Sequence, residues 1–379
     1  MPPTRSTVAH VNLAALQANY RAIVTHLAGD PKRQPPQLIA VVKANAYGHG
    51  AGPVALALEQ AGATMLACAD IEEGVALRRA GVRVPIFVFG ALSVSDLDGV
   101  LDHALTPTVA SPFAARAVES AAARRGVIIG YHLKIDTGMH RLGFRHDNLA
   151  RTLPPVLASP HLRLDGVFTH FASADVPDSP LFDQQRTRFD AAIEMLRALG
   201  GHPPLRHAAN SAALLRDSRV WYDAVRPGLL LYGIVPPPLA STIALTPAMS
   251  LTSRIVAVKG LRPGEGVGYG SRFTADEPRA IAVVPAGYAD GLDTRMANRA
   301  SVLVRGHRAP VVGAISMDMM TIDVTGLGDV EPGDEVVIIG RQGDEGWQQI
   351  DAREMAAVIG TIPWEIVCRL GTRVQRVFE

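Results

Sequence analysis

A single lysine, Lys43, stands where an apolar segment gives way to small and polar residues. The segment before it, Leu38–Val42, has the length and composition of a buried strand. Proteins of the α/β class place their chemistry at the carboxyl ends of such strands, and a partly desolvated amine there has a lowered pKa. A neutral amine can form a Schiff base, whereas a lysine without a chemical role would only extend its ammonium group to solvent. Both interpretations of Lys43 are open from this segment alone.

Four later segments with the character of strands also carry polar side chains at their ends. A single histidine at a strand end is usually structural, but lysine, arginine or histidine at four consecutive strand ends indicates a functional site. The residues concerned are Lys134, Asp136, His140 and Arg141 with the segment Ile129–Ile135, His170 with Arg163–Thr169, His207 and Asn210 with Leu205–Ala208, and Arg226 with Asp223–Arg226.

Two of these strand ends lead directly into short helical segments. Ser211 stands at the start of one, and Gly228 and Leu229 open another. Helix amino termini offer free N–H groups to an anion. Two such starts at the same edge of the fold predict a bound phosphate group.

The strand ends belong to an alternation of apolar runs and helical periodicities in the first two thirds of the chain. Asn12 can cap a first helix whose apolar residues, from Leu13 to Leu27, share one face. The alternation predicts a (β/α)8 TIM-type barrel with its active site where the strands end. An open doubly wound sheet is the alternative, but the early glycine-rich fingerprint of its dinucleotide-binding version is missing. We expect strands at Leu38–Val42, Thr64–Cys68, Pro85–Phe89, Ala104–Val109, Ile129–Ile135, Arg163–Thr169, Leu205–Ala208 and Asp223–Arg226, and helices at Gly52–Ala61, Ile71–Ala80, Pro112–Arg125, Leu181–Leu199 and Ser211–Asp217.

The pattern changes near Val235, where three successive prolines form a stiff break. Beyond it the segments are short, rich in valine and isoleucine, and separated by glycine turns, which predicts a mostly β domain. We therefore expect the barrel in residues 1–240 and the β domain in residues 241–379. Its strands are expected at Ser250–Val258, Ile281–Pro285, Ser301–Val304, Thr321–Val324 and Glu335–Ile339, with a helix within Gln349–Ile359.

The composition argues against several classes of function. The formal net charge is +1, so neither nucleic acid nor an anionic membrane surface is implied as a partner. Cys68 and Cys368 are too few and too far apart for a disulfide framework or a cysteine metal site, and the scattered histidines form no convincing metal site. The start of the chain lacks the apolar core of a signal peptide and no run approaches a membrane span, so a cytoplasmic location is expected.

Several short motifs, in their order along the chain, resemble those of the alanine racemase family. They are VVKANAYGHG around Lys43, KIDTGMHRLG around Arg141, HAANSAA around Ser211, VRPG around Arg226, and then GYG, GYADG and SMD in the second domain. The resemblance covers essentially the whole chain. It implies a barrel followed by a β domain, pyridoxal 5′-phosphate as cofactor, and interconversion of L-alanine and D-alanine to supply D-alanine for peptidoglycan.

The resemblance also implies which residues move protons. Racemisation removes a proton from one face of the α-carbon and returns one to the other face, so it needs two bases. Lys43 would bind the cofactor as a Schiff base and act as one base, and Tyr269 would be the other. Arg226 would donate to the pyridine nitrogen, and His170 and His207 would brace that arginine and the second base.

Further roles follow from the same resemblance. Arg141 would reach the phenolic oxygen of the cofactor and the substrate carboxylate, and Lys134, which is carbamylated in several relatives, would orient Arg141. In the family the second base and a substrate-binding backbone N–H, here those of Tyr269 and Met317, come from the partner subunit, so a homodimer is implied. The phosphate would be bound by Tyr47, Ser211 and the N–H groups of Gly228 and Leu229.

Departures from the family pattern leave the substrate range open. Trp364 replaces a tyrosine that bonds the cofactor phosphate and narrows the entrance, and Ala314 replaces a frequent arginine. A racemase of broader specificity, acting on serine or basic amino acids, is therefore an alternative, and a non-catalytic pyridoxal-phosphate-binding protein is a more remote one. Taken alone, Tyr269 could lie in a flexible β turn, and Met317, in an apolar run, could belong to a core.

Overall fold

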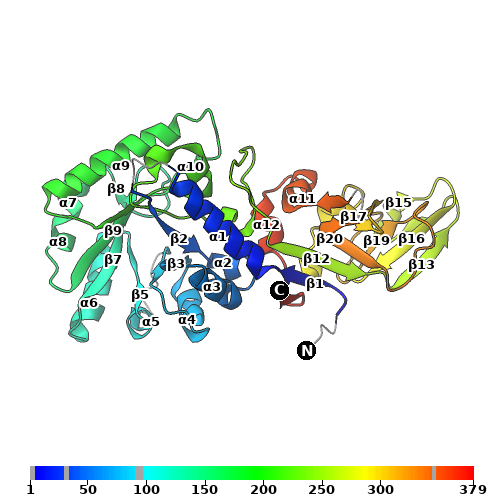
Figure 1. Ribbon diagram of the computed structural model, residues 1–379, viewed down its shortest axis with the longest axis horizontal. Coiled ribbons are helices and arrows are strands. Elements are labelled where there is room, and N and C mark those ends of the chain that lie inside the picture. The colour runs from blue at the N-terminus through cyan, green and yellow to red at the C-terminus, as the bar shows by residue number, and fades with distance from the viewer. Residues whose placement is uncertain (1–4, 30–33, 91–96, 344–346) are drawn as a thin grey trace. The chain divides into compact units, whose positions relative to one another are not determined.

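The computed structural model describes residues 5–29, 34–90, 97–343 and 347–379, which form two compact units (Figure 1). The barrel unit comprises Leu16–Ala46 and Ala51–Thr246, and the β unit comprises the described residues up to Ala15, then Tyr47–Gly50 and Pro247–Glu379. This division differs from the expected one at residue 240. The beginning of the chain and the short segment 47–50 belong to the β unit rather than to the barrel.

Eight parallel strands close into a ring in the described part of the barrel unit, as the sequence predicts. The last strand pairs with the first, so the open doubly wound alternative is excluded. The fourth strand is interrupted at Pro107, which has no N–H to donate, so β5 pairs with β4 and β6 pairs with β7. In ring order the strands are β2 (Gln37–Val41), β3 (Met65–Cys68), β4 (Ile86–Val88), β5 with β6 (Leu105–Thr106 and Thr108–Val109), β7 (Ile129–Asp136), β9 (Leu162–Phe168), β10 (Leu205–His207) and β11 (Ala224–Val225).

The helices between these strands lie within one or two residues of the expected ranges. Asp70, Ser111 and Asn210 precede helices and accept a hydrogen bond from the amide three residues further on, which satisfies an N–H that the helix leaves unpaired. Asn12 caps the first helix in the same way, as predicted. The helices are α1 (Leu13–Leu27), α3 (Ala51–Gln60), α4 (Ile71–Arg79), α6 (Pro112–Arg124), α9 (Leu181–Ala198) and α10 (Ser211–Arg216), together with three short ones that the sequence did not indicate, α5 (Leu97–Asp102), α7 (Leu149–Thr152) and α8 (Pro154–Leu157).

The β unit is built around a strand from the very start of the chain. Strand β1 (Val8–Val11) lies between β12 (Met249–Arg254), to which it is antiparallel, and β22 (Gln375–Phe378), to which it is parallel. The expected strand Ser250–Val258 is in fact two strands, because the ladder of β12 stops after Arg254 and β13 (Ala257–Leu261) pairs with β16 in another sheet. The other elements are β14 (Gly266–Val267), β15 (Phe273–Thr274), β16 (Arg279–Val284), β17 (Ser301–Val304), β18 (His307–Pro310), β19 (Met320–Asp323), β20 (Glu335–Gln342), β21 (Gln348–Ile350), α11 (Ala352–Ile359) and α12 (Pro363–Cys368).

The sheets of the β unit place two turns side by side. One sheet consists of β13, β16 and β19. Another has the strand order β18-β17-β20-β12-β1-β22, and β21 also pairs with β20. The turn after β16 and the turn before β19 bond to each other through backbone groups. Among the described residues, no helix of either unit is long and apolar enough to cross a membrane.

Candidate active site

Lys43 is followed by a left-handed turn made of residues that are not glycine. Ala44, Asn45, Ala46 and Tyr47 have φ angles of 52°, 53°, 55° and 51°. This conformation costs roughly 1–2 kcal/mol for each residue that carries a Cβ atom, so neighbouring groups must hold it. The turn therefore fixes the direction in which the chain leaves the strand β2 and with it the position of Lys43.

Two side chains anchor this turn within the barrel unit. The Glu73 carboxylate, on α4, accepts the N–H of Ala44 at 2.6 Å and the N–H of Ala69 at 2.8 Å. Glu73 thereby bridges the ends of β2 and β3. Asn45 Oδ1 accepts the N–H of Ala51 at 2.8 Å, where α3 begins. Sequence reasoning did not single out Glu73, because its role depends on a partner in another strand end.

Arg226 is buried at the end of β11, and its hydrogen-bond partners are all neutral groups. Its Nη1 donates to His207 Nδ1 at 2.9 Å, and its Nη2 donates to the carbonyls of Thr169 at 2.8 Å and Ala208 at 3.0 Å. His170 Nδ1 lies 3.4 Å from Nη2. Burial lowers the pKa of Arg226 to about 9, which still leaves the guanidinium charged at neutral pH. The barrel therefore presents a permanent hydrogen-bond donor that no carboxylate in this set of partners neutralises.

The hydrogen bond from Arg226 fixes the tautomer of two histidines. A guanidinium only donates, so His207 Nδ1 accepts and the proton of this imidazole sits on Nε2. His207 Nε2 then donates to His132 Nδ1, at 2.9 Å. Burial lowers the pKa of His132 to about 4 and that of His207 well below its usual range, so both rings stay neutral. His132 was missed from the sequence, although its spacing of two from Lys134 places both on one face of a strand.

Lys134 and Arg141 meet His170 at the same end of the barrel. They line one small cavity, and burial lowers the pKa of Lys134 to about 8, with further contributions from the cations Arg141, Arg226 and Lys43. Burial holds the pKa of His170 well below its usual range, and four cations contribute to the same effect. They are Arg226, Arg141, Lys134 and Lys43. The structure thus brings together five of the residues expected at the site.

The loop that carries Arg141 is shaped by carboxylate and hydroxyl groups. The hydroxyl groups of Thr137 and Thr169 are 2.7 Å apart, and Gln185 of α9 donates to the hydroxyl of Thr137 and to the carbonyl of His170. Gln185, which is fully buried, therefore ties this loop to the loop that carries His170. Asp136 Oδ1 accepts three successive backbone N–H groups at 3.0, 3.1 and 3.0 Å, those of Gly138, Met139 and His140.

The two helix starts expected to bind phosphate lie against each other. Ser211 begins α10, and its Oγ accepts the N–H of Gly228 at 3.0 Å and, at 3.4 Å, that of Leu230. The second start is the short helix η2 (Leu229–Tyr232). We expected the N–H of Gly228 to be free, but it donates to Ser211 Oγ. A phosphate bound here would compete with the Ser211 hydroxyl group as the acceptor of that N–H.

Lys134 is expected to make the stability of the fold depend on pH in the alkaline range. Its pKa is about 8 in the folded protein and 10.5 in the unfolded chain, so the unfolded chain binds more protons between these values. The free energy of unfolding should therefore rise with pH in this interval, by up to about 3 kcal/mol. A Lys134→Met variant should show a smaller rise in urea unfolding between about pH 8 and about pH 10 in CO2-free buffer, because it loses the contribution of Lys134 and keeps that of Arg226. Equal pH dependence in both proteins would contradict the prediction.

The remaining expected residues lie in the β unit. Tyr269 begins the short helix η3 (Tyr269–Ser271) and is 77% exposed. Met317, at 52% exposed, lies in a turn and not in a core, so that alternative interpretation is wrong. Trp364 is half-buried on α12, against which Gly48 packs closely at the carbonyl of Val367.

The expected site residues are therefore divided between the two units. Tyr47 is half-buried in the β unit, where burial and then Cys368 raise the pKa of its phenol. The residues of the β unit are Tyr47, Tyr269, Met317 and Trp364, and those of the barrel unit are Lys43, Lys134, Arg141, His170, His207, Ser211, Arg226, Gly228 and Leu229.

Comparisons with known proteins identify the family of the chain. The family model "Alanine racemase, N-terminal domain" matches residues 11–236, and "Alanine racemase, C-terminal domain" matches residues 248–378. The alanine racemase of Symbiobacterium thermophilum is 42% identical over 377 residues, covering 99% of this chain and 97% of that protein. That of Sorangium cellulosum is 41% identical, covering the whole of both proteins.

Solved structures show the same likeness over the whole chain. Alanine racemase from Bacillus anthracis with bound L-Ala-P has a TM-score of 0.91 and 35% identity, covering 100% of this chain and 96% of that one. The enzyme from Bartonella henselae with covalently bound pyridoxal phosphate has a TM-score of 0.88 and 28% identity, covering 99% of each. The motifs, the fold and these relatives agree, and the chain belongs to the alanine racemase family of pyridoxal-phosphate-dependent isomerases.

Proposed function

We propose that the chain interconverts L-alanine and D-alanine with Lys43 and Tyr269 as its two bases. The observation that supports this most is the cluster of Lys43, Lys134, Arg141 and Arg226 around His170 at the carboxyl ends of the barrel strands. Such a concentration of cations suits a ligand that carries a phosphate and a substrate that carries a carboxylate. The D-alanine formed would serve peptidoglycan synthesis in the cytoplasm.

The donor set of the barrel fits pyridoxal phosphate. The cofactor supplies an electron-withdrawing system that stabilises negative charge at the α-carbon of the substrate. Lys43 would bind it covalently, and Arg226 would donate to the pyridine nitrogen. Because a guanidinium keeps its proton, Arg226 holds this nitrogen without transferring a proton to it. The groups that would hold the phosphate are Tyr47, Ser211, Gly228 and Leu229, with Trp364 in place of the family's tyrosine.

Proton transfer falls to residues on opposite faces of the α-carbon. Lys43 removes or returns a proton on one face and Tyr269 on the other. A phenol of ordinary pKa near 10 is a weak base, so it needs stabilisation of its anionic form. Arg226, through the neutral imidazole of His170, supplies that stabilisation. His207 fixes the orientation of Arg226 by accepting its Nη1 donor.

We further propose that Lys134 carries a carbamate that orients Arg141. Only a neutral amine reacts with carbon dioxide, and burial brings the pKa of Lys134 to about 8, where this form is well populated near neutral pH. The carbamate replaces a positive by a negative charge and so gives Arg141 an ion-pair partner. Arg141 then meets the substrate carboxylate and the phenolic oxygen of the cofactor in a fixed direction.

The proposed homodimer rests on exposed side chains of the β unit. Tyr269, Tyr288, Met317 and Met319 are 77%, 46%, 52% and 48% exposed, although tyrosine and methionine side chains are usually buried to a larger extent. Large apolar side chains gathered on a surface mark a protein interface. A second copy of the chain would cover them, so that each copy contributes Tyr269 and the Met317 N–H to the Lys43 site of the other.

Mixing two inactive variants tests this arrangement. Lys43→Ala and Tyr269→Phe homodimers should each be inactive, but exchange of subunits creates heterodimers in which one site has both native residues. Random exchange of equal amounts should restore about one quarter of the native activity. Differently tagged subunits verify that exchange has taken place. If activity then stays at the level of the separate variants, either both bases lie in one chain or the two-base proposal is wrong.

Broader substrate specificity is a second candidate, favoured by Trp364 and Ala314. A Trp364→Tyr variant is expected to hold pyridoxal phosphate more tightly, because it restores the hydroxyl donor with which the family's tyrosine bonds the phosphate, whereas the bulkier indole carries its N–H at a different place on the ring. We expect the dissociation constant of the cofactor to fall about three- to tenfold, as the net gain of one ordinary hydrogen bond, about 0.7–1.4 kcal/mol, implies. Equilibrium dialysis measures it, and a racemisation panel over alanine, serine and lysine shows whether the native enzyme has the wider range. Unchanged affinity and unchanged Michaelis constants would rule out a role for Trp364 at the entrance.

A further inference from the structure

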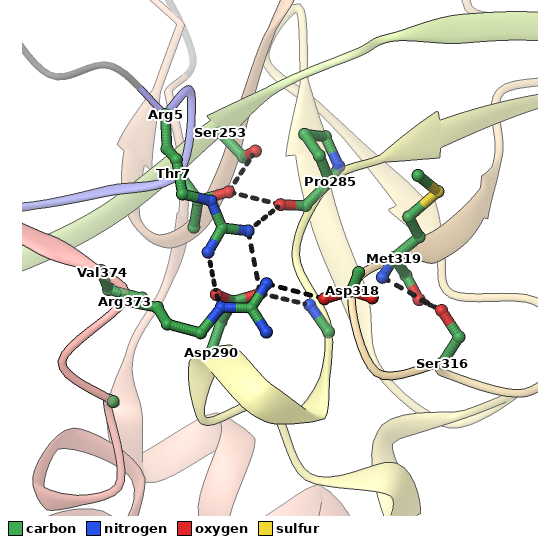
Figure 2. Close-up of polar contacts among 12 residues, drawn as sticks. Arg5, Thr7, Ser253, Pro285, Asp290, Ser316, Asp318, Met319, Arg373 and Val374 are labelled. Carbon is green, nitrogen blue, oxygen red and sulfur yellow. Dashed lines mark hydrogen bonds and ion pairs between the residues drawn. The ribbon is translucent and has the colours of Figure 1, made fainter.

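The turn Ser316–Met319, here called the Met317 turn, is closed by its own first and last residues. The N–H of Ser316 donates to the carbonyl of Met319 at 2.9 Å, and the N–H of Met319 donates to Ser316 Oγ at 3.1 Å. The hydroxyl of Ser316 also donates to the Met319 carbonyl, at 2.9 Å (Figure 2). Three bonds between two residues leave the turn little freedom.

A neighbouring turn fixes the carbonyl groups of the Met317 turn. The N–H of Tyr288 donates to the carbonyl of Ser316, and the N–H of Ala289 donates to that of Met317, each at 3.0 Å. Gly287 permits this approach, because a Cβ atom there would collide with both carbonyls. The N–H groups of Met317 and Asp318, in contrast, have no acceptor among the described residues. Two successive free N–H groups form a concave site for an anion.

Arg373 links Asp318 of this turn to a buried carboxylate (Figure 2). Its Nη2 donates to Asp318 Oδ1 at 2.7 Å, and its Nε lies 3.5 Å from Asp290 Oδ1. Asp290, only 1% exposed, also accepts Nη1 of Arg5 at 2.7 Å and the N–H of Gly287 at 3.0 Å. Two carboxylates and two guanidinium groups alternate, so the formal charges of this network cancel.

Each end of the network is anchored in a different part of the β unit. Arg5 precedes β1, and Asp290 ends the turn after β16, where its backbone carbonyl accepts the N–H of Gly371 at 3.1 Å. Arg373 is followed by Val374, which is buried. Among the four side chains of the network, that of Asp318 is the most exposed to solvent, at 54%. Its charge is held by a guanidinium whose own position is set by the buried Asp290.

We propose that Arg373 is a positioning residue that holds and neutralises Asp318, so that the N–H groups of the Met317 turn can receive the carboxylate of the substrate. The inference rests on the proposed function, which brings Met317 to the substrate. Without Arg373 a carboxylate would stand beside the two free N–H groups and repel an anionic ligand. With Arg373 in place the turn offers its N–H groups to an anion without an opposing net charge.

The substitution Arg373→Gln should raise the Michaelis constant for alanine more than it lowers kcat. We expect an increase of about three- to tenfold, as for one unscreened charge near a partly exposed site. The inhibition constant of acetate, which has a carboxylate but no amine, should rise by a similar factor. The double variant Asp318→Asn with Arg373→Gln should bring both constants back towards the native values, because it removes the repelling charge together with its partner. Arg373→Lys, which keeps the charge but not the two-point contact, should be intermediate.

The control and the readouts separate charge from general structure. Arg353→Gln removes an exposed arginine of α11 in the same unit and should change neither constant. A double variant that stays as impaired as Arg373→Gln would show that the residue acts through folding alone and would overturn the inference. Unchanged constants in Arg373→Gln, while Tyr269→Phe is inactive, would overturn it and leave the proposed function intact. A native protein that does not racemise alanine would overturn both.

Discussion

Replacing Lys43 with alanine is expected to abolish racemisation and covalent binding of pyridoxal phosphate together. The variant lacks both the amine that forms the Schiff base and one of the two bases, so kcat should fall at least about a thousandfold. The left-handed turn after Lys43 should persist, because Glu73 and Asn45 hold it through backbone N–H groups. Borohydride reduction followed by mass spectrometry shows whether the cofactor is attached to the chain.

The matched control for this experiment is Lys259→Ala. Lys259 is an exposed lysine on β13, and its removal should leave both attachment of the cofactor and activity unchanged. A Lys43→Ala variant that retains more than about one hundredth of the native activity would remove Lys43 from the catalytic step. A variant that is inactive but still labelled by reduction would show that another amine, such as that of Lys134, binds the cofactor.

Replacing Tyr269 with phenylalanine is expected to lower racemisation by about a hundredfold to ten-thousandfold and to leave cofactor attachment intact. The hydroxyl group is the only atom lost, and the side chain is exposed in the single chain, so stability should change by less than about 0.5 kcal/mol. Lys43 still serves one face of the α-carbon. The variant should therefore exchange the α-proton of one alanine enantiomer with solvent deuterium while forming almost no product of the other hand.

Proton NMR in deuterium oxide, with each enantiomer offered separately, measures both reactions. Tyr288→Phe is the matched control, because Tyr288 is another exposed tyrosine of the β unit. We expect its effect to be limited to a few-fold change in the Michaelis constant. Equal loss of exchange for both enantiomers in Tyr269→Phe would mean that the phenol serves binding or orientation and not one face of the substrate.

The barrel could be predicted because its signal is local and repeated. Each strand is a short apolar run, and each expected helix has the apolar period and, at Asp70, Ser111 and Asn210, a capping side chain. Short elements gave no such signal. Strand β1 has only four residues and its partners lie more than two hundred residues away, so nothing near it in the chain indicates that it belongs to the β unit.

The parts of the site that could not be predicted depend on contacts between distant segments. His132 matters because it meets His207, which lies 75 residues further along the chain. Glu73 matters because it reaches two other strand ends. The turn after Lys43 contradicts local propensity, since left-handed backbone normally calls for glycine, and Ala44 and Ala46 give no hint of it. The places of Lys43 and Arg226 at strand ends, in contrast, indicate a functional site from the sequence alone, and the family resemblance implies their roles.

The place of β1 between β12 and β22 determines the order in which the two units can fold during synthesis. The barrel segment Ala51–Thr246 is complete long before the ribosome reaches Phe378, whereas the sheet around β1 lacks a neighbour until β22 is made. The backbone groups of the first strand must therefore remain unpaired while the barrel segment is already complete. A fragment that begins at residue 247 would lack this strand, and β12 and β22 would each expose an edge open to aggregation or strand exchange.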